Sequence, residues 1–302
     1  LMYGYAWPGA TRMILTRWMK GKPQVHRGTL NYHRDPRAKI RGLLKRPLRR
    51  FLLRCFQAHH YGGSYSKKVL VDAGVNPDSL FFVPYSVNSP RFLEGAGDAE
   101  NIHAAALIRR NMGWEEGDRV LLFIAQHSWF KGPDIAMEVF RRYQLQDGTA
   151  RFLVVGSGSM TEAMKALSRE QGLQQSVHFA DFVPSQDTIP YYLASDLVLC
   201  TSRYETWARM VNEAMLCGRP CLINDIVPAA GGLVEDGVSG YVVRGLDPAS
   251  YVGVIARHFA MSSMERRKMG EAAMAAAKRF SYDESIHNVL EAARYAVGVV
   301  DQ

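Results

Sequence analysis

The segment from Leu197 to Val243 constrains the fold of this chain more than any other. It reads LVLCTS, RYETWARMVNEAMLCG, RPCLIND and, after a Gly-rich turn, GYVV. This alternation of apolar strands with a helical pattern is typical of a parallel sheet. The segment carries Glu205 in the loop after the first strand and Glu213 in the helix. Because ligands of open parallel sheets bind beyond the carboxyl ends of the strands, we expect this loop to lie at a ligand site.

Strands alternate with helical patterns along the rest of the chain, which predicts an α/β fold with parallel sheets covered by helices. The 302 residues suffice for two domains. We predict a first domain over residues 1–92, a second over 93–282 and a terminal helix over 283–302. The polar, Gly- and Ala-rich stretch 88–106 has no strong periodicity and is interpreted as the linker. The chain opens with LMYGYAW, which reads as the end of a buried strand, so we expect the first domain to be incomplete.

The positive charge of the chain is concentrated in its first hundred residues. Residues 1–100 hold 17 Lys and Arg against 6 Asp and Glu, whereas residues 101–302 hold 20 against 23. Much of the excess lies in 37–54, RAKIRGLLKRPLRRFLLR, whose apolar residues recur at helical spacing up to a break at Pro47. Two interpretations stay open, a solvated basic helix face and a surface that docks on anionic lipid. We expect no nucleic-acid partner, because no aromatic residues interleave with the charges.

Composition gives no sign of a membrane span or a metal site. No apolar run reaches the roughly 18 residues that a transmembrane helix needs, and no signal peptide is visible. The four cysteines lack the spacing of a zinc site and are interpreted as reduced structural residues: Cys55, Cys200, Cys217 and Cys221. We therefore expect a cytoplasmic protein without metal, with peripheral contact to the inner face of the membrane as an alternative.

The helix after Glu205 combines two features that suit a nucleotide. Residues 206–209 would open this helix, and the free N–H groups and positive dipole end of a helix start suit a diphosphate. The carboxylate of Glu213 can accept two hydrogen bonds and so suits the paired hydroxyls of a ribose. The alternative is that both acids are ordinary surface groups. The downstream pattern NEAMLCGRPCLI, a helix running tightly into a buried strand, weakens that alternative.

Other candidate groups follow predicted strands. Lys131 comes after a strand that ends at Ala125, where an ammonium can meet phosphate oxygens, although a solvated surface lysine is the simpler alternative. The Gly156–Gly158 turn is weak evidence, and it lacks the dinucleotide fingerprint, so NAD is not proposed. His26 and Arg27 follow a short strand of the first domain. They would point into a cleft if the two domains face each other, and are otherwise loop residues without a role.

These motifs together match a known pattern of an acidic residue, a turn, Glu-Ala-Met in a helix and Gly-x-Pro before a strand. Here the pattern stands as Glu205-Thr206-Trp207-Ala208, Glu213-Ala214-Met215 and Gly218-Arg219-Pro220. Lys131-Gly132, Val155-Gly156-x-Gly158 and Phe182-Val183 support it. The chain resembles the family-4 retaining glycosyltransferases of the GT-B fold across nearly its whole length.

The resemblance implies two Rossmann-like domains, the second holding a nucleotide diphosphate sugar and the first an acceptor, with the final helix crossing back to the first domain. It implies transfer with retention and without a metal or other cofactor. Glu205 would contact the donor hexose and Glu213 the ribose, while Gln126 and Lys131 take the places of a basic pair on the diphosphate. The remaining donor-side candidates are Gly156, Phe182, Val183, Thr206, Trp207, Ala208 and Arg209, and the acceptor-side candidates are His26 and Arg27.

The chain departs from this family at several positions. Ala125-Gln126 stands where Gly-Arg is usual, Asp181 and Ala208 where glycine is expected, and Pro228 and Gly232 in the turn after the fifth strand. Loss of a cation beside phosphate weakens donor binding by about 1.5–3 kcal/mol if nothing replaces it. Arg209 and Arg203 are the candidates to replace it.

The leading hypothesis is a retaining glycosyltransferase that moves a hexose from a nucleotide diphosphate sugar to a hydroxyl of a glycan or lipid-linked acceptor. Lys131 and the helix start near Ala208 would stabilise the leaving diphosphate, and Glu205 would orient the hexose. Two alternatives stay open, a non-catalytic nucleotide-sugar-binding or scaffold protein and an epimerase of the same fold. The resemblance suggests polysaccharide or envelope biosynthesis in a bacterium. The donor base, the sugar and the acceptor are not indicated.

Overall fold

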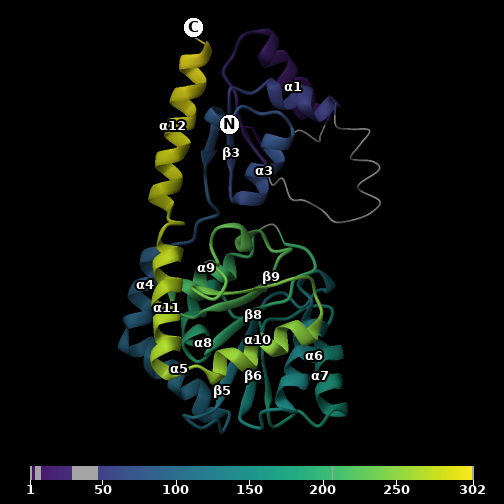
Figure 1. The fold of residues 1–302 in the computed structure, drawn as a ribbon, viewed down its shortest axis with the longest axis vertical. Coiled ribbons are helices and arrows are strands. Elements are labelled where there is room, and N and C mark those ends of the chain that lie inside the picture. Colours follow the sequence, from purple (N-terminus) through teal and green to yellow (C-terminus); the bar gives the residue numbers. More distant parts are fainter. Residues whose placement is uncertain (1, 4–7, 29–46, 206, 301–302) are drawn as a thin grey trace. The chain divides into compact units, whose positions relative to one another are not determined.

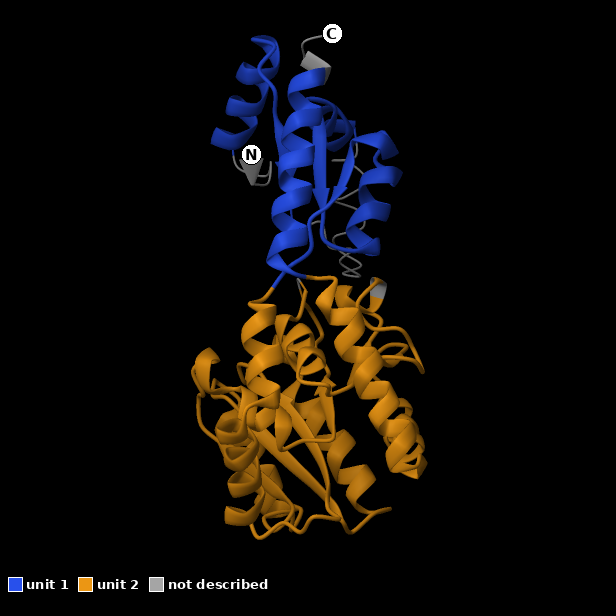
Figure 2. Ribbon diagram, turned by 90° about the vertical axis from the view of Figure 1, so that its left-hand side faces the viewer, with its two compact units in different colours: residues 1–86, 281–302 blue, residues 87–280 orange. Residues whose placement is uncertain are grey.

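The chain folds into two compact units with separate sheets. The computed structural model describes residues 2–3, 8–28, 47–205 and 207–300 (Figure 1). Unit 1 consists of residues 1–86 and 281–302, and unit 2 of residues 87–280 (Figure 2). The units divide at 86/87 and 280/281, where the sequence suggested 92/93 and 282/283. The predicted α/β fold with two parallel sheets is confirmed.

Unit 2 holds a sheet with the strand order β10-β9-β8-β5-β6-β7, and every neighbouring pair is parallel. Its strands are β5 (Arg119–Ile124), β6 (Ala150–Val155), β7 (Val177–Ala180), β8 (Leu197–Cys200), β9 (Cys221–Asn224) and β10 (Gly240–Val243). β8 and β9 are buried along their whole length. Helices on both faces of a parallel sheet require such continuously apolar strands, which is why the sequence revealed them.

The helices of unit 2 pack in groups. They are α4 (Ser89–Gly97), α5 (Ala99–Asn111), α6 (Pro133–Gln144), α7 (Thr161–Glu170), α8 (Ile189–Leu193), α9 (Arg209–Leu216), α10 (Pro248–Ala260) and α11 (Ser263–Lys278). α6 packs against α7 and α10, and α9 packs against α4 and α11, while α5 lies on α8. Among the described residues, no helix has both the length and the apolar character that crossing a bilayer requires.

The stretch 88–106 was wrongly interpreted as a linker, because it forms α4 and most of α5. Asn88 and Asp98 begin these helices, each accepting a backbone N–H through its side chain. Phe92 of α4 is buried, and its ring centroid lies 6.4 Å from that of Tyr192 in α8. The helical period was hidden because Ala105 is the only buried residue that α5 contributes within the described structure.

Unit 1 holds a parallel sheet with the order β1-β2-β3-β4. Its elements are β1 (Met2–Tyr3), α1 (Pro8–Met19), β2 (Val25–Arg27), a helix over 47–54, β3 (Ala58–Tyr61), α3 (Ser64–Asp72), β4 (Leu80–Phe82) and α12 (Tyr282–Val300). Leu52 of the helix over 47–54 is buried in one cluster with Ile14 of α1 and with Phe56, which follows the helix.

The terminal helix α12 completes unit 1. Its Ala292 and Ala296 are buried against Val25 and Ala58, and such small side chains let the helix approach the strands closely. At its start, the Ser86 hydroxyl lies 2.7 Å from the carbonyl oxygen of Ser281 and 2.7 Å from the hydroxyl of Ser285. The segment after β4 is therefore tied directly to the beginning of α12.

Candidate functional site

Lys131 and Glu205 come together at the carboxyl edge of the unit 2 sheet. β5 and β8 are parallel neighbours, so the loops that follow them begin at the same edge. Lys131 Nζ and Glu205 Oε2 form an ion pair between these loops. The Glu205 side chain is 8% exposed and that of Lys131 is 30% exposed, so the ammonium is the more accessible partner.

Close backbone packing places Lys131. The next residue, Gly132, has φ +65°, and a Cβ there would overlap the carbonyl oxygen of Thr201. The Thr201 hydroxyl donates to the Gly132 carbonyl at 2.8 Å, and Arg203 N donates to the Phe130 carbonyl at 2.8 Å. Because only glycine fits this approach, the Lys131-Gly132 motif has a steric origin.

The loops after β5 and β6 are packed together in the same way. Gly156 has φ +122°, and a Cβ there would overlap the carbonyl oxygen of Ala125. The backbone N–H of His127 donates to the Ser157 carbonyl at 3.0 Å. Gln126 is exposed between these contacts, at the position where the family pattern has arginine. Gly156 therefore shapes this edge of the sheet by its lack of a side chain.

The start of α9 carries a strained residue. Ala208 has φ +73° and ψ +69°, and it is the one residue other than glycine with positive φ in the described part of the chain. Trp207 beside it is buried, donates through Nε1 to Asn212 Oδ1 at 2.7 Å, and lies 5.5 Å from the ring of Phe280. Its side chain thus anchors the turn from within the core. Thr206, a predicted donor-side residue, lies outside the described residues.

Glu213 has a different partner from Glu205. Its Oε2 accepts a hydrogen bond of 2.7 Å from the hydroxyl of the fully buried Tyr192. Burial raises the pKa of Glu213, while the Tyr192 hydrogen bond and the charges of Arg209 and Arg91 oppose that rise. Arg209 is exposed one helical turn before Glu213. We expected Lys131, Glu205 and Glu213 to share one site. In the structure Lys131 and Glu205 form an ion pair, whereas Glu213 is hydrogen-bonded to Tyr192.

The other predicted donor residues follow β7. Phe182 is 72% exposed, and Val183 is half-buried. β7 is the outermost strand on its side, two positions from β5. These residues are therefore further along the sheet edge than the loops that carry Lys131 and Glu205.

The two acceptor-side candidates lie in β2 of unit 1. His26 is fully buried, with its ring 5.2 Å from that of Phe56 and 5.4 Å from that of His59. His26 is thus enclosed within unit 1 and is part of the strand, not of a loop after it, and burial lowers its pKa to about 4. Arg27 is half-buried, with its guanidinium 5.9 Å from the centre of the Tyr85 ring.

Sequence reasoning missed an aromatic cluster beside Lys131. Trp129 and Phe130 are 58% and 55% exposed, with ring centroids 5.6 Å apart. Arg203 lies 4.9 Å from the centre of the Trp129 ring and is bound to Asp134 by two hydrogen bonds, which lower the pKa of Asp134. The dipeptide Trp-Phe directly before Lys131 was the signal that could have revealed this cluster. Tyr192 was missed too, because no local pattern indicates a partner 21 residues away.

Solved glycosyltransferases share this architecture. The crystal structure of Anabaena Alr3699/HepE in complex with UDP and glucose matches with a TM-score of 0.73 at 18% identity, over 96% of this chain and 76% of that chain. Sucrose-phosphate synthase from Thermosynechococcus elongatus matches with a TM-score of 0.70 at 16% identity, over 93% of this chain and 71% of that chain. The fold is therefore of the GT-B type.

The sequence assigns the family. The profile of Glycosyl transferases group 1 matches residues 105–276, and the chain belongs to this family. A D-inositol 3-phosphate glycosyltransferase of Acidothermus cellulolyticus is 31% identical over 241 residues, 76% of this chain and 51% of the relative. The protein of the same name from Geodermatophilus obscurus is 30% identical over 235 residues, 72% of this chain and 48% of the relative. The chain spans about half the length of these curated relatives.

Proposed function

We propose that this chain carries the donor site of a retaining, metal-independent glycosyltransferase. It would transfer a hexose from a nucleotide diphosphate sugar to a hydroxyl of a glycan or lipid-linked acceptor. The observation that carries the proposal is the ion pair of Lys131 with Glu205 at the shared edge of β5 and β8. Relatives support it, since Anabaena HepE was crystallised with UDP-glucose and the curated relatives are named glycosyltransferases.

In this proposal the leaving diphosphate meets positive charge from two sources. The ammonium of Lys131 is accessible enough to bind phosphate oxygens while it stays beside Glu205. The N–H groups at the start of α9 would supply the second source, because no side chain of the described residues caps this helix. Charge that develops on the leaving group is thereby stabilised by groups already in place.

Glu213 would hold the ribose. Tyr192 occupies Oε2 and so leaves the second carboxylate oxygen for a sugar hydroxyl. For the cation lost at Gln126, Arg209 is the better replacement, because it is exposed at the first turn of α9. Arg203 is already committed to Asp134.

Binding and transfer assays with matched variants test this function. UDP, other nucleoside diphosphates and their sugars are titrated calorimetrically, and transfer is assayed with glycans, lipid-linked sugars and inositol phosphates. Lys131→Ala should weaken diphosphate binding by roughly 10- to 100-fold, corresponding to about 1.5–3 kcal/mol. Glu205→Gln should bind the nucleotide and lose on the order of 100-fold in transfer. Lys268→Ala, an exposed lysine on α11, is the control. If both site variants bind the donor and transfer sugar as the wild type does, the proposed donor site is wrong.

A non-catalytic nucleotide-sugar-binding protein is the second candidate. The exposed Gln126 in place of a cation and the strained Ala208 in place of glycine favour it. The two functions separate in the same assays. Saturable donor binding without turnover, across all acceptors, supports the second candidate.

We also propose that unit 1 contacts anionic membranes. Of the basic segment 37–54, residues 37–46 lie outside the described structure, and 47–54 form a helix. On this helix and on α1, exposed apolar side chains lie among exposed arginines. Trp18 and Phe51 are each 45% exposed, with ring centroids 5.8 Å apart, and Leu48 is 57% exposed. An aromatic and basic surface of this kind suits the headgroup region of a bilayer.

A further inference from the structure

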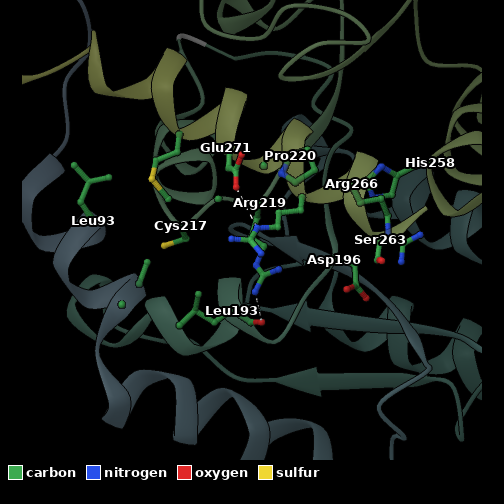
Figure 3. A pocket seen from close by; sticks show the side chains of 16 residues that line it. Leu93, Leu193, Asp196, Cys217, Arg219, Pro220, His258, Ser263, Arg266 and Glu271 are labelled. Carbon is green, nitrogen blue, oxygen red and sulfur yellow. Dashed lines mark hydrogen bonds and ion pairs between the residues drawn. The ribbon is translucent and has the colours of Figure 1, made fainter. Parts of the chain in front are cut away.

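A cavity of about 570 Å³ lies in unit 2 at the edge of the sheet opposite to Lys131 and Glu205 (Figure 3). Asp196 stands directly before β8, and Arg219 and Pro220 stand directly before β9, so the cavity opens at the amino ends of these strands. α4 and α11 supply most of the remaining wall, and α8 and α10 contribute Leu193 and His258. The proposed donor site uses none of these residues.

Arg219 is the least satisfied charge in the cavity wall. Its Nη2 donates to the carbonyl of Leu193 at 2.9 Å, while its Nε is buried and has no hydrogen-bond partner among the described residues. A guanidinium has five N–H donors, and a charge held away from water is costly unless it is paired. Burial lowers the pKa of Arg219, and Asp196 opposes this effect. The side chain points to the middle of the lining residues in Figure 3.

Asp196 and Glu271, the acids of the wall, form their ion pairs with other arginines. Asp196 accepts the Val120 N–H at 2.7 Å and pairs with Arg109 at 3.7 Å. Glu271 pairs with Arg267 at 3.1 Å on the exposed side of α11. Both acids therefore already have cationic or N–H partners.

Arg266 adds a second cation. Its Nη1 donates to the carbonyl of Met261, and it forms no ion pair with a carboxylate of the described chain. Beside it, burial and the Arg266 charge lower the pKa of His258 to about 4, so this imidazole is neutral at pH 7. Among the described residues, the side chains of Arg219 and Arg266 thus donate hydrogen bonds to backbone carbonyls and to no carboxylate.

We propose that this cavity binds a phosphorylated small molecule of the size of a sugar phosphate or a nucleotide. Guanidinium groups bind phosphate oxygens through paired hydrogen bonds, and Arg219 and Arg266 would supply them. The volume falls within the range of ligand pockets. Leu93 and Met274 add an apolar wall for the body of the ligand. The site is separate from the donor site and lies at the other end of α9.

Titration in two backgrounds tests the site. Inorganic phosphate, pyrophosphate and glucose 6-phosphate are titrated calorimetrically into the wild-type chain and into Lys131→Ala. At least one probe should bind both proteins saturably, with a dissociation constant below about 10 mM. Arg219→Gln and Arg266→Gln should each weaken that binding by at least roughly 10-fold. Arg169→Gln, an exposed arginine on α7, should leave it unchanged.

The variants also give results that would overturn the site. Binding that disappears in Lys131→Ala belongs to the donor site, and binding that survives both arginine variants does not use the cavity. Absence of saturable binding by all three probes overturns the proposal as well. If the melting curve of Arg219→Gln differs from that of the wild type, the variant is not folded normally, and Arg266→Gln alone shows whether the cavity binds the probe. Lack of donor binding in the earlier assays would leave the cavity result intact, because the two sites share no residue.

Discussion

At the scale of single residues, Ala208 shows how the candidate site stores strain. A left-handed conformation costs an alanine roughly 1–2 kcal/mol, because its Cβ crowds the backbone. The buried indole of Trp207, bonded to Asn212, holds the adjoining turn in place. The start of α9 is thus positioned by the core at the expense of local stability, a pattern common at binding sites.

Relief of this strain is measurable. Ala208→Gly should stabilise unit 2 by about 0.5–1 kcal/mol, because glycine adopts positive φ without crowding. Chemical denaturation compares it with Ala214→Gly, a buried position inside α9 that should lose about 1 kcal/mol or more. Equal destabilisation by the two substitutions contradicts strain at Ala208.

At the scale of elements, the sequence predicted those that bury a continuous surface. β8 and β9 were predicted from the sequence because both of their faces are covered and all their residues are buried. α4 and α5 were not predicted, because few of their residues enter the core. For the site, the loop positions of Lys131 and Glu205 followed from the strand pattern. Their contact depends on β8 lying beside β5, a tertiary neighbour relation that no local pattern encodes. The Tyr192–Glu213 bond was hidden for the same reason.

The role of α4 can be tested directly. Phe92→Ala should destabilise unit 2 by about 3–5 kcal/mol, because a buried aromatic side chain leaves a cavity beside Tyr192. Ile102→Ala on α5, where the side chain is 51% exposed, should cost far less. Similar denaturation midpoints for both variants would mean that Phe92 of α4 does not contribute to the hydrophobic core of unit 2.

At the scale of the whole molecule, unit 1 contains a cluster of buried titratable side chains. Unit 1 buries three neighbouring histidines in β2 and β3, and burial is the main cause that lowers their pKa values to about 4 for His26, about 3 for His59 and about 4 for His60. Their unfolded pKa is about 6.5. The unfolded chain therefore binds protons first as the pH falls.

Acid should consequently destabilise unit 1. Its stability is complete above about pH 6.5 and declines from there toward about pH 3–4, by up to about 1.4 kcal/mol per pH unit for each histidine. Urea denaturation between pH 7.5 and 5 should show that the free energy of unfolding falls with pH. In His60→Gln, the slope should correspond to the uptake of about one proton fewer on unfolding. His103→Gln, exposed on α5, is the control. A slope that His60→Gln does not alter would place the proton uptake elsewhere.

Membrane contact by unit 1 is a prediction at the same scale. Anionic vesicles should retain the chain at low salt and release it as salt screens the charges. Arg50→Glu and Phe51→Ser should each reduce retention, and vesicles of neutral lipid serve as the control. If retention does not depend on the salt concentration, or if the chain is not retained at low salt, the proposed membrane contact is wrong.

The ties among Ser86, Ser281 and Ser285 have a consequence for how the protein is made. Unit 2 is one uninterrupted stretch of chain, whereas unit 1 needs its first 86 residues and its last helix together. On the ribosome, β2, β3 and β4 are made before α12, so the face that α12 covers stays unprotected until residues 281–302 have been synthesised. A chain that stops before residue 281 should therefore contain a folded unit 2 joined to an aggregation-prone unit 1.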